Sequence, residues 1–150
     1  MYDTVLFPTN GGVASENAAE SAVETAAKHD AELRVLYVVD EPIYSAYSGD
    51  EYVHEHEGLE SALREVGEEA LEEVADEARE AGVEFVTEMR DGTPEQEILE
   101  YIAETGPEIV IMGTKERPDE YRQMLGSVTE RVLRTTSVPV TVVKTPVAEN

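Results

Sequence analysis

Apolar segments of strand length alternate along this chain with longer segments whose apolar residues recur at helical spacing. The strand-like segments are residues 4–7, 33–39, 83–87, 109–112 and 138–143. The helix-like segments are residues 15–29, a long one from Leu59 that ends before Gly82, one that opens at 93–96 and one that opens at Ser127. Such alternation is typical of an α/β fold in which helices cover both faces of an open parallel sheet. We therefore expect a five-stranded parallel sheet with any ligand bound at the carboxyl ends of its strands.

Length and composition fit one globular domain spanning residues 1–150. No apolar run approaches the roughly 18 residues that a membrane-spanning helix needs, and the N-terminus lacks a basic start followed by an apolar stretch. The absence of cysteine excludes disulfides, thiol catalysis and cysteine-bound metals. We therefore expect a cytoplasmic protein without membrane insertion.

The formal net charge is −23 at pH 7, and lysine is scarce, at Lys28, Lys115 and Lys144. Repulsion among so many carboxylates destabilises a compact chain at low ionic strength, whereas molar salt shortens the Debye length to about 3 Å. The composition therefore favours adaptation to a salt-filled cytoplasm, as in a halophilic organism, and an ordinary acidic protein is the alternative. Either surface repels the phosphates of DNA and RNA, so we expect no nucleic-acid partner.

Residues 113–144 depart from this acidity, because they hold six of the eleven basic residues and only four acidic ones. Within them, the strand 109–112 leads into Gly113, a polar loop, Gly126 and a helix that opens at Ser127. Backbone N–H groups and the positive end of the helix dipole face such a loop, which is the arrangement of an anion site. The segment therefore predicts a negatively charged ligand. A tight turn at Gly113 and a helix cap at Ser127 are the purely structural alternatives.

Two of the expected helix starts carry the pattern of a capping box. Thr93 is followed three residues later by Gln96, with Pro94 in the first turn, and Ser127 is followed by Glu130. In a capping box the first side chain accepts a hydrogen bond from the backbone of the helix's first turn. We therefore expect both hydroxyls to cap their helices, a role that competes with ligand binding at Ser127.

Three stretches resemble the universal stress protein family, and the likeness covers almost the whole chain. Residues 7–11 resemble the first strand and turn of that family, and residues 36–40 resemble the end of its second strand. The most specific pattern is glycine, two residues, glycine, nine residues, then glycine with serine or threonine, which matches here from Gly113 to Gly126-Ser127. Residues 128–133 and 138–140 continue the likeness.

This resemblance implies a flavodoxin-like sheet in the order 3-2-1-4-5, a homodimer that pairs through the C-terminal strand (Val138 to Val143) and, in one branch of the family, bound ATP. ATP with Mg²⁺ would lie between the ends of the first and fourth strands. The expected ligand-binding residues are Pro8, Thr9, Asn10, Val38, Met112, Gly113, Lys115, Glu116, Arg117, Gly126, Ser127, Val128 and Thr129. We expect no catalytic residue and no specific metal ligand.

The chain departs from the family pattern at two positions. Glu116 replaces the second glycine and brings a carboxylate toward the phosphates, where one repelling charge pair costs about 1 kcal/mol in a wet site. Lys115 and Arg117 flank this carboxylate, and a divalent cation could bridge it to phosphate. Asn10 stands in place of the usual aspartate after the first strand, so it can bind a ribose hydroxyl without charge assistance.

The segment 41–58 reads as irregular and contains two further candidates. His54 and His56 would lie on one side of an extended chain, as a metal pair does, but no third ligand is evident. Three tyrosines of this segment could form a lid over a nucleotide or belong to a surface loop. They are Tyr44, Tyr47 and Tyr52.

The sequence is therefore compatible with three alternative functions. The first is a nucleotide-binding regulatory protein in the stress response. The second is a ligand-free dimeric scaffold in which Glu116 marks a lost phosphate site. The third is a nucleotide-cleaving enzyme, which the turn at residues 10–15 supports only weakly, because no activated nucleophile or acid–base pair accompanies it. We expect the first of the three.

Overall fold

The chain folds around a five-stranded parallel sheet, seen here in a computed structural model that describes residues 2–42, 53–115 and 127–145. The strands are β1 (Thr4–Thr9), β2 (Glu32–Asp40), β3 (Phe85–Gly92), β4 (Ile109–Lys115) and β5 (Val140–Thr145). The main helices are α1 (Val13–His29), α3 (Val53–Glu80), α4 (Pro94–Thr105) and α5 (Ser127–Thr135). The strand order is β3-β2-β1-β4-β5, which confirms the predicted α/β class and the order 3-2-1-4-5.

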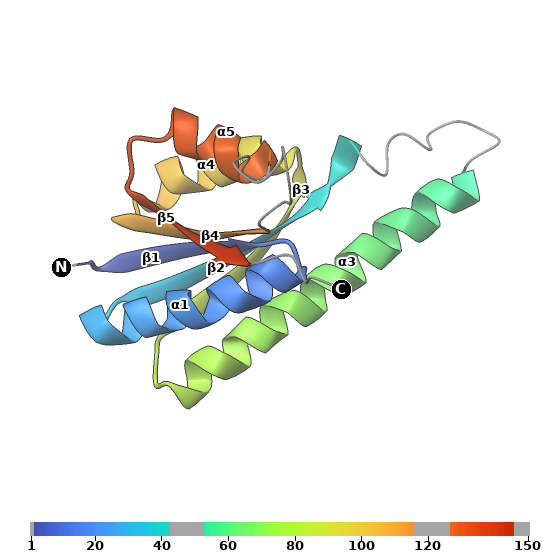
Figure 1. Ribbon diagram of the computed structural model, residues 1–150. Coiled ribbons are helices and arrows are strands. Elements are labelled where there is room, and N and C mark those ends of the chain that lie inside the picture. The colour runs from blue at the N-terminus through green and yellow to red at the C-terminus, as the bar shows by residue number, and fades with distance from the viewer. Residues whose placement is uncertain (1, 43–52, 116–126, 146–150) are drawn as a thin grey trace, which may run out of the picture.

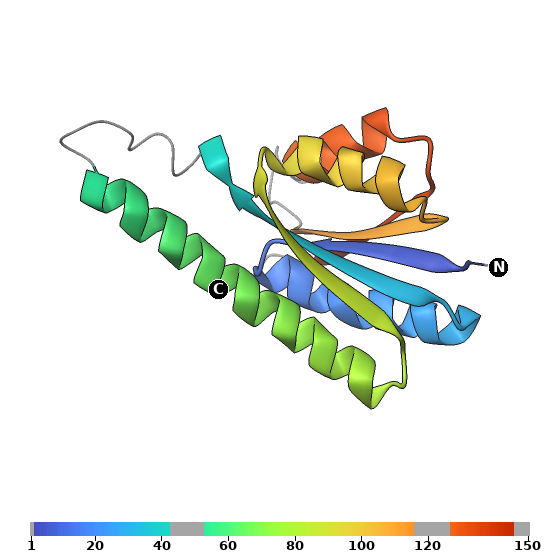
Figure 2. The same cartoon turned by 180° about the vertical axis from the view of Figure 1, so that it is seen from behind.

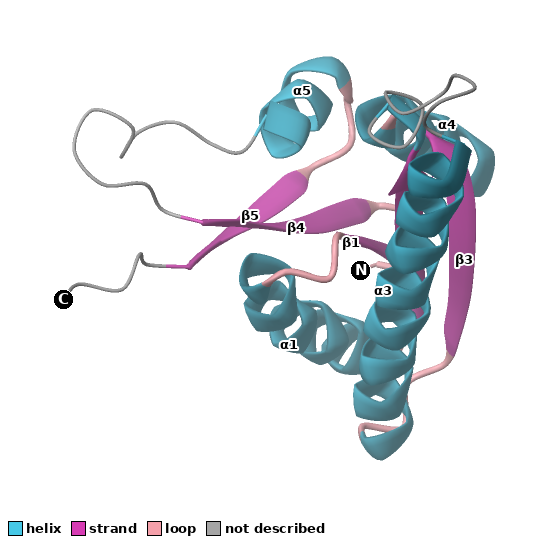
Figure 3. Ribbon diagram, turned by 90° about the vertical axis from the view of Figure 1, so that its right-hand side faces the viewer, coloured by secondary structure: helices cyan, strands magenta, loops and turns pink. Residues whose placement is uncertain are grey.

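Two layers of helices enclose this sheet. Helices α1 and α3 cover one face and α4 and α5 cover the other (Figure 1), and the reverse view shows the same separation (Figure 2). Figure 3 shows the molecule from the side beyond the carboxyl ends of the strands, with α4 and α5 above the sheet and α1 below it. Helix α3 is the longest, and its N-terminal turns extend beyond the carboxyl ends of the strands.

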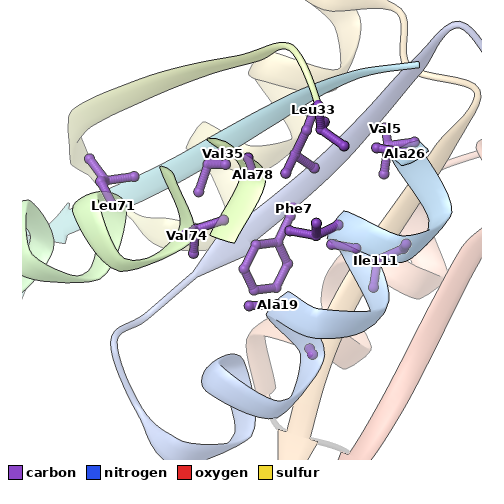
Figure 4. Close-up of a cluster of buried hydrophobic side chains, with 14 of the residues drawn as sticks. Val5, Phe7, Ala19, Ala26, Leu33, Val35, Leu71, Val74, Ala78 and Ile111 are labelled. Carbon is purple, nitrogen blue, oxygen red and sulfur yellow. The ribbon is translucent and has the colours of Figure 1, made fainter. Parts of the chain in front are cut away.

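Each sheet face has its own apolar core, and neighbouring residues of β1 enter different cores. Val5 and Phe7 pack under α1 and α3 with Leu33 and Ile111 (Figure 4), whereas Leu6 packs under α4 and α5. Since side chains alternate across a strand, a strand with helices on both sides must be apolar at consecutive positions. This requirement explains the unbroken apolar run of β1.

Helix α1 approaches the sheet closely because alanines form its buried face. Ala18, Ala22 and Ala26 are fully buried, and Ala19 is nearly so. Small side chains let the helix axis lie near the strands, which brings the start of α1 close to β4. This close approach positions one wall of the cavity described below.

Several expected element boundaries were wrong. The third strand runs over Phe85–Gly92 instead of residues 83–87, because it pairs with β2 as far as Asp40 and Gly92. The fourth strand continues to Lys115 and pairs with β5 along its length, so Gly113 is a strand residue and not a turn. The last strand is correspondingly shifted, from the expected 138–143 to Val140–Thr145.

Helix α3 begins at Val53, well before the expected start at Leu59. His54 and His56 therefore belong to a helix. The prediction of an extended chain at these residues, on which the proposed metal pair depended, is wrong. The tyrosines proposed as a lid, Tyr44, Tyr47 and Tyr52, lie outside the described residues.

The described helices, α3 included, are rich in charged residues. None of them combines the length and the apolar character needed to cross a bilayer.

Candidate functional site

A cavity of about 310 Å³ opens at the carboxyl ends of the central strands. It lies where β1 has β2 on one side and β4 on the other, which is the point at which the strand order of such a sheet reverses. Its lining comes from β1, β2, β4 and the four helices. The lining residues are Pro8, Thr9, Asn10, Ser15, Leu36, Tyr37, Val38, Asp40, Leu63, Pro94, Ile98, Met112, Gly113, Val128 and Thr129.

Most of this surface is apolar. Leu36, Ile98 and Met112 are buried side chains of the core under α4 and α5, and Val38 and Val128 pack against them. An apolar cavity with a few polar groups at its rim is the usual form of a small-molecule site. The walls therefore suit a flat, uncharged ring better than a charged group.

Three helices begin at this cavity. Ser15 belongs to the first turn of α1, Pro94 is the first residue of α4, and Val128 and Thr129 lie in the first turn of α5. The first N–H groups of a helix have no partner within it, and the helix dipole places partial positive charge there. The cavity thus combines apolar walls with three positive helix ends, which favours a ligand that is part ring and part anion.

Asn10 is bound within its own turn. Its side-chain oxygen accepts hydrogen bonds from the backbone N–H of Gly12 (2.8 Å) and from the hydroxyl of Ser15 (2.8 Å). The Ser15 oxygen in turn accepts a bond from the backbone N–H of Asn10 at 3.1 Å. Gly11 has φ 79°, a conformation that glycine adopts without strain, as expected for this turn. The expected role of Asn10 as a ribose acceptor must therefore compete with these bonds, although Asn10 is one of the residues that line the cavity.

Two threonines at the cavity also bond to the protein itself. The Thr9 side-chain oxygen accepts a hydrogen bond from the backbone N–H of Gly11 at 3.2 Å. The Thr129 hydroxyl donates to the carbonyl of Gly113 at 3.4 Å and so links α5 to β4. Both side chains are buried. Their hydroxyls fix the walls more than they offer groups to a ligand.

The carboxylate of Asp40 and the phenol of Tyr37 add two ionisable groups to the lining. Burial raises the pKa of Tyr37, and the charge of Asp40 raises it further, so the phenol stays protonated at neutral pH. The ring of Tyr37 lies against α3 at Gly67, where a Cβ atom would come within 2.4 Å of it. Glycine in the middle of that helix is thus required by packing.

The expected capping boxes were tested at one helix. Thr93 precedes α4 and Pro94 opens it, as predicted, but the Thr93 side chain makes no capping hydrogen bond. That part of the prediction is wrong. At the second box, α5 begins at Ser127 itself, and the residue before it lies outside the described residues. Whether the Ser127 hydroxyl caps this helix therefore stays a prediction.

The structure brings together eight of the predicted ligand residues: Pro8, Thr9, Asn10, Val38, Met112, Gly113, Val128 and Thr129. Ser127 is exposed and does not line the cavity, although it opens α5 beside it. Lys115 ends β4, and its side chain is outside the described part of the chain. Glu116, Arg117 and Gly126 lie there as well, so the effect of Glu116 on the phosphate region stays a prediction.

Two of the basic residues that suggested an anion site are engaged elsewhere. Arg131 pairs with Glu95 at 3.2 Å, and Arg134 pairs with Glu130 at 2.7 Å. Both guanidinium groups are largely exposed on α5, where such pairs contribute little to stability. The positive character of the described cavity therefore comes from helix ends.

Sequence reasoning missed seven lining residues: Ser15, Leu36, Tyr37, Asp40, Leu63, Pro94 and Ile98. The rule that ligands lie at the carboxyl ends of strands could have found Asp40, the last residue of β2, and Pro94, the first residue after β3 and its turn. Leu63 carries no such signal. Its position depends on where α3 crosses the sheet, which side-chain packing decides.

A doubly wound sheet with an apolar cavity ringed by helix N-termini is the arrangement of α/β proteins that bind a small ligand at the switch point of the sheet. The comparison with known families is more specific. Residues 1–144 match the model of the universal stress protein family, and the chain belongs to that family.

Individual relatives agree with this assignment. The chain is 38% identical to the universal stress protein MJ0531 of Methanocaldococcus jannaschii over 149 residues, which cover 99% of this chain and 86% of that protein. Among solved structures, the protein MJ0577 superposes with a TM-score of 0.81 at 26% identity, with 97% of each chain covered. A universal stress protein family protein from Arabidopsis thaliana, solved with AMP bound, shares the fold with a TM-score of 0.68 at 19% identity, over 95% of this chain and 91% of that one.

Proposed function

We propose that this chain is a regulatory protein of the stress response that binds ATP, with Mg²⁺, in the cavity at the carboxyl ends of β1, β2 and β4. The observation that carries the proposal is the meeting of three helix N-termini on an apolar cavity. Val38, Ile98 and Met112 offer a surface for adenine, and the start of α5 offers N–H groups for phosphates. The AMP held by the Arabidopsis thaliana protein of the same fold supports a nucleotide as the ligand.

Titration of the purified protein with ATP and Mg²⁺ in molar KCl tests this proposal. We expect saturable binding, and no saturation with or without Mg²⁺ would overturn it. Ser127→Asp places a carboxylate at the start of α5, where the helix itself tolerates an acid well. We expect it to weaken ATP binding by about fivefold or more through repulsion of the phosphates.

Ala81→Asp is the matched control for this added charge. Ala81 is exposed and follows α3, at the end of the sheet where β3 begins, far from the cavity. The Ala81→Asp substitution adds the same charge to the same protein. A loss of ATP affinity shared by both variants would therefore indicate general repulsion between the protein and the nucleotide. A specific loss in Ser127→Asp supports phosphates at the start of α5.

The proposed role of the protein is binding without turnover, in the cytoplasm. Incubation with labelled ATP tests this part, because a true enzyme converts many equivalents, whereas a binding protein releases the label intact. Multiple turnovers that are lost in a cavity variant would replace the regulatory proposal with an enzymatic one.

We further propose that two copies pair through β5, which lies at one edge of the sheet. The carbonyl of Pro139 accepts a hydrogen bond from the N–H of Val110 in β4. Backbone groups of successive strand residues point to opposite edges, so the N–H groups of Val140 and Val142 point away from β4. No strand of the described part of the chain lies on that side of β5, so a second sheet edge could accept hydrogen bonds from them.

Val142→Pro removes one of these outward donors without removing a bond to β4. We expect sedimentation equilibrium to give the mass of a dimer for the natural chain and of a monomer for the variant. A monomeric natural chain would contradict the proposal. An unchanged dimer in a folded variant would place the interface elsewhere.

One observation favours a ligand-free scaffold as the second candidate. The acceptor oxygen of Asn10 is already bound by Gly12 and Ser15, which removes one expected contact with ribose. In that case Glu116 marks a lost site, and Glu116→Gly should create ATP binding that the natural chain lacks. ATP binding by the natural chain with micromolar affinity would exclude this candidate.

A further inference from the structure

We propose that the ion pair between Arg64 and Asp91 is a positioning device that fixes two walls of the nucleotide cavity and thereby sets how tightly the cavity holds its ligand. The inference rests on the proposed function, because the ligand is the nucleotide proposed above. It assigns a role to two residues that do not line the cavity.

The pair has the geometry of a strong interaction. The Nη2 atom of Arg64 donates to both carboxylate oxygens of Asp91, at 2.7 and 2.6 Å. The Nη1 atom of the same guanidinium lies 3.9 Å from the sulfur of Met89. Both charged side chains are partly buried, with 43% exposure for Arg64 and 31% for Asp91. Short charge-assisted bonds that are shielded in part from water are stronger than ordinary surface pairs.

Each partner stands next to a residue of the cavity wall. Arg64 follows Leu63, which lines the cavity from α3. Asp91 is separated from Pro94, the lining residue that opens α4, by only Gly92 and Thr93. The pair therefore connects the α3 wall to the α4 wall, although these helices lie on opposite faces of the sheet.

These two walls need such a connection. Among the described strands β3 lies at an edge with β2 alone beside it, and Asp91 lies near the end of β3. The N-terminal turns of α3 extend beyond the carboxyl ends of the strands, so the sheet supports them less than it supports the C-terminal turns (Figures 1 and 2). The ion pair between Arg64 and Asp91 joins α3 to the end of β3 and so fixes the position of Leu63 relative to Pro94. A ligand that fills the space between them then binds a preformed cavity.

If Arg64 instead attracted the phosphates directly, the substitution of Asp91 would have the opposite effect on ATP affinity. If its charge attracted the phosphates directly, removal of Asp91 would release that charge and strengthen ATP binding. If the pair positions the walls, removal of either partner weakens binding. A positioning role also acts on the whole ligand, so adenosine should lose affinity by the same factor as ATP.

The experiment measures the dissociation constants of ATP and adenosine for the natural chain, Arg64→Ala, Asp91→Ala and the exchanged pair Arg64→Asp with Asp91→Arg. We expect each single variant to weaken both ligands by about fivefold, and the exchanged pair to recover part of the loss. Arg64→Lys keeps the charge on a shorter side chain and loses the second guanidinium nitrogen, which contacts Met89, so we expect an intermediate loss.

Arg79→Ala is the matched control on the same helix. Arg79 pairs with Glu72 and Asp76, all three side chains are more than half exposed, and none of them lines the cavity. We expect its affinity for both ligands to stay within twofold of the natural value. Circular dichroism and urea unfolding show whether each variant is folded at the temperature of the binding measurement.

The outcomes separate this inference from the proposed function. Absence of ATP binding by the natural chain overturns both. Binding by the natural chain with unchanged constants in folded Arg64→Ala and Asp91→Ala overturns the positioning role alone. Tighter ATP binding in Asp91→Ala, or a loss for ATP without one for adenosine, also overturns it and assigns Arg64 to direct attraction of phosphate.

Discussion

Gly113 in β4 lies directly against Ala14 in the first turn of α1. A Cβ atom at Gly113 would come within 2.3 Å of the carbonyl oxygen of Ala14 and 3.1 Å of the Cβ of Ala18. Real atoms do not approach so closely, and a backbone carbonyl cannot move aside as a flexible side chain can. Only glycine at this position allows the start of α1 to reach the strand. Gly113 thus serves the packing of a helix that forms part of the cavity.

Gly113→Ala should therefore displace the start of α1. Forcing one extra methyl group into a packed site costs about 1–3 kcal/mol, and we expect a loss of that order in the free energy of unfolding measured with urea. Gly58→Ala is the control, because it lies in α3 with nothing within 4 Å of an added Cβ. Alanine is the better helix former, so this control should gain up to about 1 kcal/mol. Equal effects in both variants would contradict the packing role.

Asn10 and Ser15 should behave as one unit in the turn before α1. Asn10→Ala and Ser15→Ala each remove bonds of this turn, and we expect each to cost about 1 kcal/mol in the free energy of unfolding. The double variant should cost less than the sum of the two, because the second substitution finds the shared bond already lost. Urea unfolding of the four proteins measures this coupling. Strict additivity would show that the bonds act independently.

Salt should stabilise the protein strongly. The groove between α1 and α3 is lined by five glutamates and two apolar residues: Glu16, Glu20, Val23, Glu24, Glu77, Glu80 and Ala81. Since molar salt screens such repulsion, we expect the melting temperature to rise by about 5 °C or more between 0.1 and 2 M KCl. A variant with glutamine at Glu20, Glu77 and Glu80 should show a smaller rise. A melting temperature independent of KCl would refute adaptation to a salt-filled cytoplasm.

Glu77 gives this groove a pH dependence. Desolvation raises its pKa in the folded protein, and the charges of Glu20, Glu73 and Glu80 raise it further. The folded state therefore binds a proton more readily than the unfolded state does, and this group lowers stability as the pH rises through its folded pKa. Glu77→Gln should thus be more stable than the natural chain at pH 7. We expect a gain of about 0.5 kcal/mol or less, because the group is exposed.

The advantage of Glu77→Gln should vanish below about pH 4, where the carboxyl is protonated in both states. Thermal unfolding from about pH 3 to pH 8 tests this dependence. Glu69→Gln, at an exposed position of the same helix, provides the comparison. A gain at pH 7 that persists unchanged at low pH would show that the amide acts by some means other than the lost charge.

The periodicity of the sequence was enough to predict the parallel sheet, because buried strands must be apolar on both faces, as Val5, Leu6 and Phe7 are. Strand ends were harder to predict. The polar residues that close β3 look like loop, and they extend the strand only because β2 lies beside them. The family resemblance supplied the strand order and most of the cavity lining on the β1, β4 and α5 sides.

What the sequence could not supply was the approach of helices to the sheet. Gly113 was predicted to form a turn because nothing near it in the sequence shows why glycine is needed there. The reason is its contact with Ala14, ninety-nine residues earlier in the chain. Leu63 became part of the cavity because Gly67 allows α3 to cross over Tyr37. Such long-range contacts depend on three-dimensional packing, and a residue pattern read locally does not contain them.

The cavity is assembled from β1, β2, β4 and the four helices, so no fragment of the chain can reproduce it. Any molecule that fills it binds the folded state alone and protects that state by mass action, by about 2.7 kcal/mol at a hundred times its dissociation constant. Proteases degrade the unfolded chain. The cellular lifetime of the protein, and with it its abundance, would therefore follow the supply of its ligand.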